Sequence, residues 1–172
     1  MAGTARKVTV VGDPLLAKVS EPVRSFDDWL SALIDDMFAT MEVASGVGLA
    51  APQIGTDLAV FVYDCPDAEG RRHLGHIVNP TIVSTSGPED TSEEGCLSVP
   101  GPYHELARPS VATIRGVDKT AAPIEVTGTG FFARCLIHET EHLHGILFID
   151  HLPRNRRRRV LREMTPFSWN AV

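Results

Sequence analysis

The sequence is poor in cysteine and has no long apolar run. Its 3 cysteines, Cys65, Cys96 and Cys135, are an odd number at irregular positions, which argues against a disulfide framework and favours a reducing compartment. The N-terminal stretch MAGTARKVTVVG lacks the apolar core of a signal peptide, and no later run approaches the length of a membrane span. These absences predict a cytoplasmic protein without a membrane partner.

An excess of positive charge is also absent. The 16 lysines and arginines are outnumbered by 22 acidic residues, and the net charge of -6 argues against a nucleic-acid binder that works through its overall field. A hydrophobic fraction of 43% and a charged fraction of 22% are those of an ordinary globular protein. Because the 172 residues contain neither an internal repeat nor a low-complexity linker, we expect one domain over residues 1–172.

Two segments have the apolar spacing of helices. Residues 25–44 carry apolar side chains three and four positions apart, and Ser25 with Asp28 resembles a capping box at the start. Residues 131–145 form the second segment, with Gly145 as its expected end.

The other segments complete an α+β pattern. GVGLAAPQIGTD (46–57) is expected to be a loop, because three glycines and a proline in ten residues disfavour both helix and strand. A short polar helix is expected over 154–164. β-Branched or aromatic runs bounded by turn residues predict short strands at 58–65, 75–85, 110–118 and 123–130. The order predicts an α+β fold of mostly antiparallel strands around a central metal-binding helix, with an N-terminal helix and a short C-terminal helix.

The second helix contains a metal-binding pattern, HETEH, at residues 138–142. The four-residue spacing places His138 and His142 on one helix face, so both imidazoles can reach a single ion. Glu139 stands where its carboxylate can take a proton from a water molecule whose pKa a metal lowers from about 15.7 to about 7. The competing interpretation is a charged helix whose two histidines face solvent.

A catalytic metal site needs a third protein ligand, which this motif does not supply. The metzincin continuation is disfavoured because Phe148 stands where its third histidine should be. Glu163 could serve as in thermolysin-like metalloendopeptidases, although Arg159 four residues earlier indicates a solvated helix pair. Cys96, in EEGCLSVPG, could bring a thiolate from a loop turned by Pro100-Gly101-Pro102, but a lone cysteine is more often an inert core residue. The residues alone leave both candidates open.

Three other residues near the motif are weaker candidates for the third ligand. His144 points away from the metal face, and His151 is expected to cap or pair locally. Cys135, one turn before the first histidine, is more simply a small buried side chain.

Three stretches of the chain together resemble the motifs of peptide deformylase, in the same order. They are GVGLAAPQIG (46–55), EGCLSVP (94–100) and HETEH followed by LHG (138–145). The combination is highly specific and covers almost the whole chain. The resemblance implies a monomeric, cytosolic hydrolase that removes the formyl group from the N-terminal formylmethionine of nascent polypeptides and releases formate.

The resemblance also implies a ligand set and a metal. Cys96 would join His138 and His142 around one divalent ion, typically Fe2+, with Zn2+, Ni2+ or Co2+ able to use the same ligands. Glu139 would act as base and then as acid. The side-chain amide of Gln53, together with the backbone N–H of Leu97, would face the developing oxyanion.

Substrate contacts follow from the same resemblance. Gly46 and Gly48 would let an extended peptide pair with the chain as an added strand. Val47, Phe131 and Cys135 would line an apolar pocket for the methionine side chain.

The family pattern also locates a buried acid and two departures. Glu94 would lie beneath the site, with Arg108 or Arg134 as its partner. Ile137 stands where the family usually has Gln, and Glu141 where it usually has Asp. The longer carboxylate of Glu141 could still orient a metal-binding imidazole.

An arginine run, comprising Arg154, Arg156 to Arg159 and Arg162, is the last feature. It indicates either a solvated helix end or, as in some family members, contact with ribosomal RNA. Two rival functions remain for the whole chain. One is a metalloendopeptidase that uses Glu163, and the other is a non-catalytic peptide- or ribosome-binding protein with a structural metal.

Overall fold

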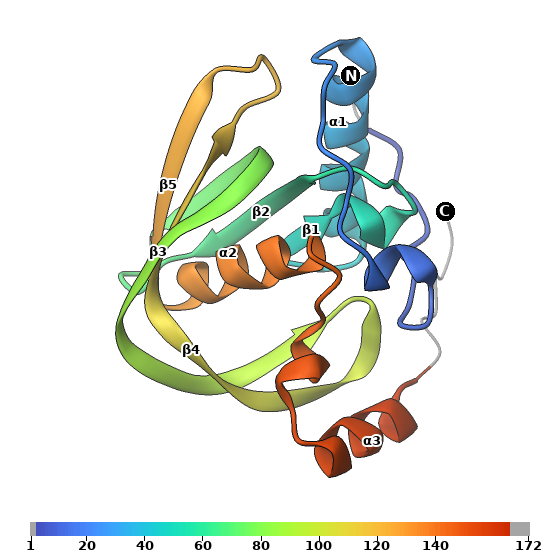
Figure 1. The fold of residues 1–172 in the computed structure, drawn as a ribbon, viewed down its shortest axis with the longest axis vertical. Coiled ribbons are helices and arrows are strands. Elements are labelled where there is room, and N and C mark those ends of the chain that lie inside the picture. Colours follow the sequence, from blue (N-terminus) through green and yellow to red (C-terminus); the bar gives the residue numbers. More distant parts are fainter. Residues whose placement is uncertain (1–2, 166–172) are drawn as a thin grey trace.

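A computed structural model of the protein describes residues 3–165. Within this range the helices are α1 (Asp28–Val43), α2 (Phe131–His142) and α3 (Arg154–Glu163), with short 3-10 segments η1 (Pro14–Ala17), η2 (Ala51–Ile54) and η3 (Phe148–His151). The strands are β1 (Gly48–Ala50), β2 (Val60–Pro66), β3 (Arg72–Cys96), β4 (Val99–Val117) and β5 (Pro123–Thr129). The predicted α+β class is confirmed (Figure 1). The expected domain bounds also include residues 1–2 and 166–172, which lie outside the described residues.

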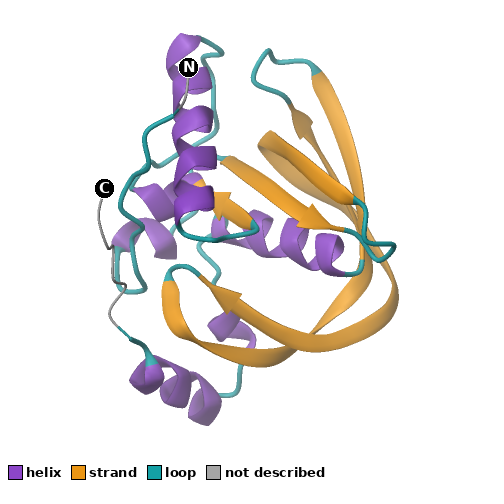
Figure 2. Ribbon diagram, turned by 180° about the vertical axis from the view of Figure 1, so that it is seen from behind, coloured by secondary structure: helices purple, strands orange, loops and turns teal. Residues whose placement is uncertain are grey.

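The five strands form one antiparallel sheet in the order β1-β2-β3-β4-β5. Strands β3 and β4 make a long ribbon that curls around α2, as Figure 2 shows from behind. The sequence predicted strands only over 75–85 and 110–118 in this ribbon; in β3 the remainder was missed because the stretch SGPEDTSEEG has little intrinsic β propensity. Pairing with β4 holds this stretch extended, and register shifts along the pair bend the ribbon.

Helix α1 packs one apolar face on β1 and β2. Its buried side chains include Leu30, Leu33 and Met37, as the helical spacing predicted. The predicted capping box at its start is wrong. Asp27 is the N-cap, and its side chain accepts a hydrogen bond from the Leu30 amide at 3.1 Å. No helix within residues 3–165 is long and apolar enough to cross a membrane.

The glycine-rich segment 46–57 is not a loop throughout, so that prediction is wrong. Residues 48–50 pair with β2 as the short edge strand β1, and residues 51–54 form η2. The backbone hydrogen bonds of residues 48–50 come from a neighbouring strand rather than from local propensity, whereas those of η2 are local. Strand β1 packs against α2, where a loop had been expected.

Helix α2 lies in the middle of the molecule, between the ribbon and the rest of the sheet (Figure 1). Phe132 and Leu136 are fully buried in an apolar cluster with side chains of β2, β3 and β4. The helix ends at His142, three residues before the predicted end. Gly145 adopts a positive φ of 71°, which suits its expected role in terminating the helix.

Candidate metal centre and active site

A cleft of about 480 Å3 opens beside α2. Its walls come from four parts of the chain: residues 45–53, the tip of the β3–β4 ribbon, the N-terminal and middle turns of α2, and Thr165 after α3. Ten residues that the sequence placed in the site line this cleft: Gly46, Val47, Gly48, Gln53, Glu94, Cys96, Leu97, Phe131, Cys135 and Glu139. His138 also lines it, whereas His142 lies behind it.

The ligand atoms of Cys96, His138 and His142 all lie within 4.8 Å of one another. The two Nε2 atoms are 3.1 Å apart, and the Cys96 Sγ lies 3.3 Å from the Nε2 of His142. No other such group of three occurs within residues 3–165. One sulfur and two nitrogens that converge on one point form a donor set suited to a transition-metal ion with an open position.

Cys96 reaches this point from the end of a strand, not from a loop as predicted. It is the last residue of β3 and pairs with Val99, so the chain turns at residues 97–98 rather than at Pro100-Gly101-Pro102. The register shifts between Glu94 and Cys96, but the two strands stay paired up to this tight turn, so the thiol is held by the ribbon itself.

The histidines have unequal partners. The Nδ1 atom of His138 lies 2.7 Å from the Oε1 atom of Glu94, which leaves Nε2 as the ligand atom. The Nδ1 atom of His142 is buried and has no hydrogen-bond partner. Although burial opposes it, contacts with Cys96 and Glu94 raise the pKa of His138, whereas burial and then His138 lower the pKa of His142. A metal ion would therefore displace a proton from this cluster on binding.

Glu94 lies beneath the site, as the resemblance implied, and both candidate arginines bind it. Arg108 donates to its two oxygens at 3.0 and 2.7 Å, and Arg134 donates to Oε2 at 2.8 Å. Burial alone would favour the neutral acid, but hydrogen bonds with His138 and Arg108 outweigh burial and hold the pKa of Glu94 well below its usual range.

Glu141 does not orient a metal-binding imidazole, so that expectation is wrong. Its two oxygens accept hydrogen bonds from Arg108 at 2.8 and 2.9 Å. Its Oε1 atom also lies 2.9 Å from the Nε2 atom of His151. Successive side chains on an α-helix point roughly 100° apart. Glu141, directly before His142 in α2, therefore faces Arg108 and His151 and not the ligand cluster.

Glu139 is buried next to the metal ligands, and burial raises its pKa to about 7. Its Oε2 atom has no hydrogen-bond partner. Gly48 packs so closely against the side chain that a Cβ there would overlap Oε1 of Glu139. Edge strand β1 therefore forms a wall that fixes this carboxylate.

Gln53 is 1% exposed and is held at both ends of its amide. Its Oε1 atom accepts from the Ala50 amide at 2.8 Å, and its Nε2 atom donates to Ser98 Oγ at 3.1 Å. The Nε2 atom also lies 3.7 Å from the Cys96 sulfur, which places this amide beside the ligand cluster. Sequence reasoning gave Ser98 no role, although the residue stands inside EGCLSVP.

The apolar residues expected around the methionine side chain gather at one end of the cleft. Val47 and Phe131 remain 39% and 44% exposed at its mouth, and Cys135 is buried deeper, with its thiol 3.5 Å from the Val47 carbonyl oxygen. Tyr103 and Thr165 also line the cleft. The sequence did not assign these two residues, since they come from the ribbon and from the segment after α3.

The rival ligand Glu163 lies outside the site. It is exposed on α3 and accepts from Arg159 Nε at 2.7 Å, as the four-residue spacing indicated. His144 is exposed and bonds to the Thr140 carbonyl, and His151 pairs with Glu141. Neither histidine belongs to the ligand cluster.

Comparisons with known proteins show which family the sequence matches. Residues 5–158 match the sequence model of the polypeptide deformylase family. The chain is 53% identical over 165 residues to peptide deformylase 1 of Streptomyces avermitilis, covering 94% of this chain and 76% of that one. It is 46% identical over 168 residues to peptide deformylase 2 of Streptomyces coelicolor, covering 98% and 94%.

Solved structures of peptide deformylases have a similar fold. A peptide deformylase from Legionella pneumophila superposes with a TM-score of 0.84 at 45% identity, covering 92% of each chain. The peptide deformylase of Ehrlichia chaffeensis in complex with actinonin gives a TM-score of 0.87 at 34% identity, covering 92% of this chain and 95% of that one.

Proposed function

Because this chain belongs to the polypeptide deformylase family, we propose that it removes the formyl group from the N-terminal formylmethionine of nascent polypeptides and releases formate. The observation that carries the proposal is the convergence of Cys96, His138 and His142 with a buried glutamate in one open cleft. The family is metal-dependent, and the donor set suits one divalent ion.

Cys96, His138 and His142 would hold the metal, for which we propose Fe2+. When bound, the ion would act as a Lewis acid and lower the pKa of a water molecule to about 7. A thiolate makes this donor set softer than three nitrogens or oxygens, so Zn2+, Ni2+ and Co2+ could use it as well. Glu94 would keep His138 in the tautomer that presents Nε2.

Glu139 would carry the protons. A pKa of about 7 suits a group that must accept a proton and release it again at neutral pH. It would first take a proton from the attacking water and then deliver it to the nitrogen of the departing amine. The packing of Gly48 against the carboxylate would keep it in place during both transfers.

Gln53 and the backbone N–H of Leu97 would stabilise the oxyanion. The Gln53 amide carries two N–H donors, and the bond to Ser98 occupies one of them. The second points towards the Cys96 sulfur at 3.7 Å, and this weak contact would give way to a hydrogen bond with the formyl oxygen. Preorganised donors of this kind contribute about 2.7–4 kcal/mol each to transition-state stabilisation in other hydrolases.

The peptide would bind as an added strand. Strand β1 pairs only with β2 among the described strands, so its other edge can accept hydrogen bonds from an extended chain beside Gly46 and Gly48. The methionine side chain would then enter the apolar end of the cleft lined by Val47, Phe131 and Cys135.

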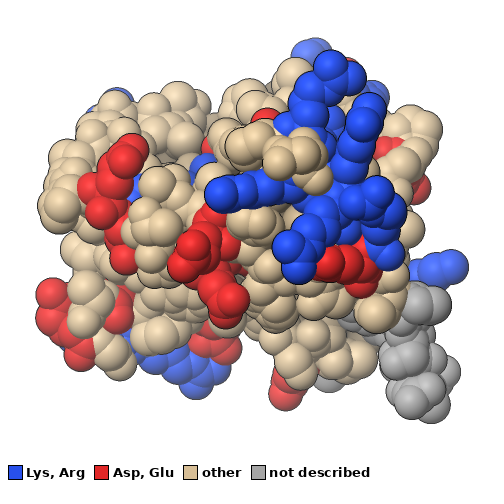
Figure 3. Space-filling model, turned by 90° about the horizontal axis from the view of Figure 1, so that it is seen from below, with Lys and Arg blue, Asp and Glu red and all other residues tan. Residues whose placement is uncertain are grey.

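We also propose that the protein works in the cytoplasm as a monomer and contacts the ribosome through α3. Lysine and arginine side chains gather over this helix in Figure 3. Two of its arginines are paired, Arg157 with Asp150 and Arg159 with Glu163. A variant with glutamine at Arg154, Arg156 and Arg158 should sediment less with ribosomes at low salt, and unchanged, salt-insensitive association would dispose of this contact.

Formate release from a formyl-Met tripeptide tests the main proposal. The protein should be loaded anaerobically with ferrous iron and assayed beside a Glu139→Ala variant. We expect formate from the wild type and none above background from the variant, with equal metal content in both. Absence of formate from the iron-loaded wild type would refute the proposal, while activity in the variant would remove Glu139 from the mechanism.

A further inference from the structure

A line of charged groups runs from the metal cluster to the molecular surface. It begins at His138 and passes through Glu94 and Arg108 to Glu141 and His151. Glu94 and Arg108 are buried, Glu141 is 15% exposed, and His151 is 37% exposed. The line joins β3, β4, α2 and η3 by contacts between side chains.

Arg108 is shared between two carboxylates. Its Nε and Nη2 atoms bind Glu94, and its Nη1 and Nη2 atoms bind Glu141, in four hydrogen bonds of 2.7 to 3.0 Å. Such two-pronged pairs fix the plane of the guanidinium group. Glu141 binds the guanidinium edge of Arg108 that faces away from Glu94, and so helps to hold Arg108 in the orientation in which it donates to both Glu94 oxygens.

Two buried guanidinium groups, Arg108 and Arg134, face two carboxylates, Glu94 and Glu141, so these four charges balance only when Glu141 is included. Glu94 receives hydrogen bonds from two buried guanidinium groups, those of Arg108 and Arg134. Asp90, which pairs with Arg134, is 48% exposed, so solvent screens its charge. Without Glu141 the Glu94 carboxylate would face an uncompensated positive charge close to the metal ligands.

We propose that Glu141 is a positioning residue of the metal centre, which sets metal affinity by neutralising Arg108. An unbalanced Arg108 would draw electron density from Glu94 and weaken its hydrogen bond with His138. It would also repel a divalent cation held by that histidine. This proposal rests on the proposed function for the identity of the site, but it concerns metal affinity and not the reaction.

Glu141 lies outside the substrate cleft, so its effect should be separable from substrate binding. Neither Glu141 nor Arg108 lines the cleft, whereas Glu94 and Arg134 do. A change at Glu141 should therefore alter metal affinity and leave the KM of the metal-loaded protein unchanged. A role in fold stability alone would change the melting temperature without changing metal affinity.

Competition between the protein and a chelator for Co2+ tests the proposal directly. For Glu141→Gln we expect the dissociation constant for Co2+ to rise about tenfold, the lower end of the range for partners of metal ligands. The visible absorption of bound Co2+ should shift. Glu141→Asp keeps the charge and should lie closer to the wild type than Glu141→Gln does.

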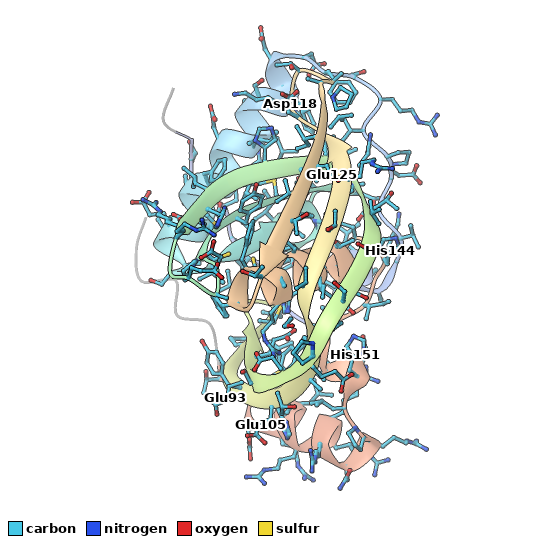
Figure 4. The ribbon with its side chains drawn as sticks, turned by 90° about the vertical axis from the view of Figure 1, so that its left-hand side faces the viewer. Glu93, Glu105, Asp118, Glu125, His144 and His151 are labelled. Carbon is cyan, nitrogen blue, oxygen red and sulfur yellow. The ribbon has the colours of Figure 1, made fainter. Side chains whose placement is uncertain are left out.

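The matched control is Glu125→Gln, which removes the same charge from an exposed pair with Arg115. Glu125 lies on the sheet, well separated from His151 in Figure 4. The Glu125→Gln variant should bind Co2+ with the same affinity as the wild type. If Glu141→Gln does not fold, the variant Arg108→Met with Glu141→Gln removes both charges of the pair and should bind Co2+ nearly as the wild type does.

Unchanged affinity and absorption in a folded Glu141→Gln variant would overturn the proposal. So would a Glu141→Asp variant as weak as Glu141→Gln, because that result would indicate side-chain length and not charge. Weak Co2+ binding by the double variant would overturn it as well. Because Co2+ affinity is measured without substrate, the proposal can fail or hold independently of formate release.

Discussion

Substituting Gly48 by alanine should impair catalysis without removing the metal. The backbone at Gly48 has no positive φ, so alanine can adopt it. Its Cβ would lie 2.8 Å from both Cγ and Cδ of Glu139, against the 3.4 Å or more of an ordinary contact. The carboxylate must therefore retreat by at least about 0.6 Å, since its Oε1 atom is closer still and the backbone of the edge strand is held in place by β2.

A displacement of this size is large for a proton carrier. Misplacement of a reacting group by about 1 Å can cost about 100-fold in rate, so we expect kcat to fall roughly tenfold to 100-fold. Metal content should stay at the wild-type level, because Glu139 is not among the three converging ligands. The assay is formate release at saturating formyl-Met peptide, with metal content measured on the same samples.

Gly46→Ala is the matched control for this experiment. Its Cβ would meet the Leu97 Cδ1 atom at 2.9 Å, the end of a flexible side chain that can move aside. We expect Gly46→Ala to raise KM more than it lowers kcat, because it narrows the edge along which the peptide would lie. Wild-type kcat in Gly48→Ala would refute the argument that close packing at this glycine holds Glu139 in its working position.

Three further changes have outcomes that the contacts determine. Gln53→Glu keeps the acceptor for the Ala50 amide but loses both N–H donors, the one to Ser98 and the one proposed for the oxyanion, so kcat should fall about 100-fold to 1000-fold in the formate assay while the protein stays folded. Cys96→Ala should abolish stoichiometric metal binding, and a variant that retained the metal would point to another third ligand. The pKa of Asp67 is held well below 3.8, first by its hydrogen bond with His73, so this carboxylate stabilises the fold above pH 4 and progressively less as pH falls through its folded-state pKa. The stability difference between the wild type and Asp67→Asn, measured by urea unfolding, should therefore shrink from pH 7 to pH 3, and a constant difference would contradict the role of its charge.

The sequence alone determined the parts of the site that are local in the chain. The spacing of His138 and His142 places both on one helix face whatever surrounds the helix, because α-helical geometry repeats within four residues. The position of Glu139 follows for the same reason. The apolar periodicity of α1 and α2, and the end of α2 near Gly145, are likewise properties of short segments.

The tertiary structure decided everything that depends on distant segments meeting. Cys96 reaches the helix because the β3–β4 ribbon bends, and that bend comes from pairing between strands and not from local propensity. Residues 48–50 became an edge strand because β2 supplies their hydrogen bonds.

The ion-pair partners of the buried charged residues also could not be predicted from the sequence. Residue types alone could not choose between Arg108 and Arg134 for Glu94, and the fold uses both. Nor could they show that Glu141, next to a ligand histidine in the chain, turns away from the metal cluster towards Arg108 and His151. A charge alone does not specify its partner, since ion pairs between distant segments form only where packing brings both groups out of water together.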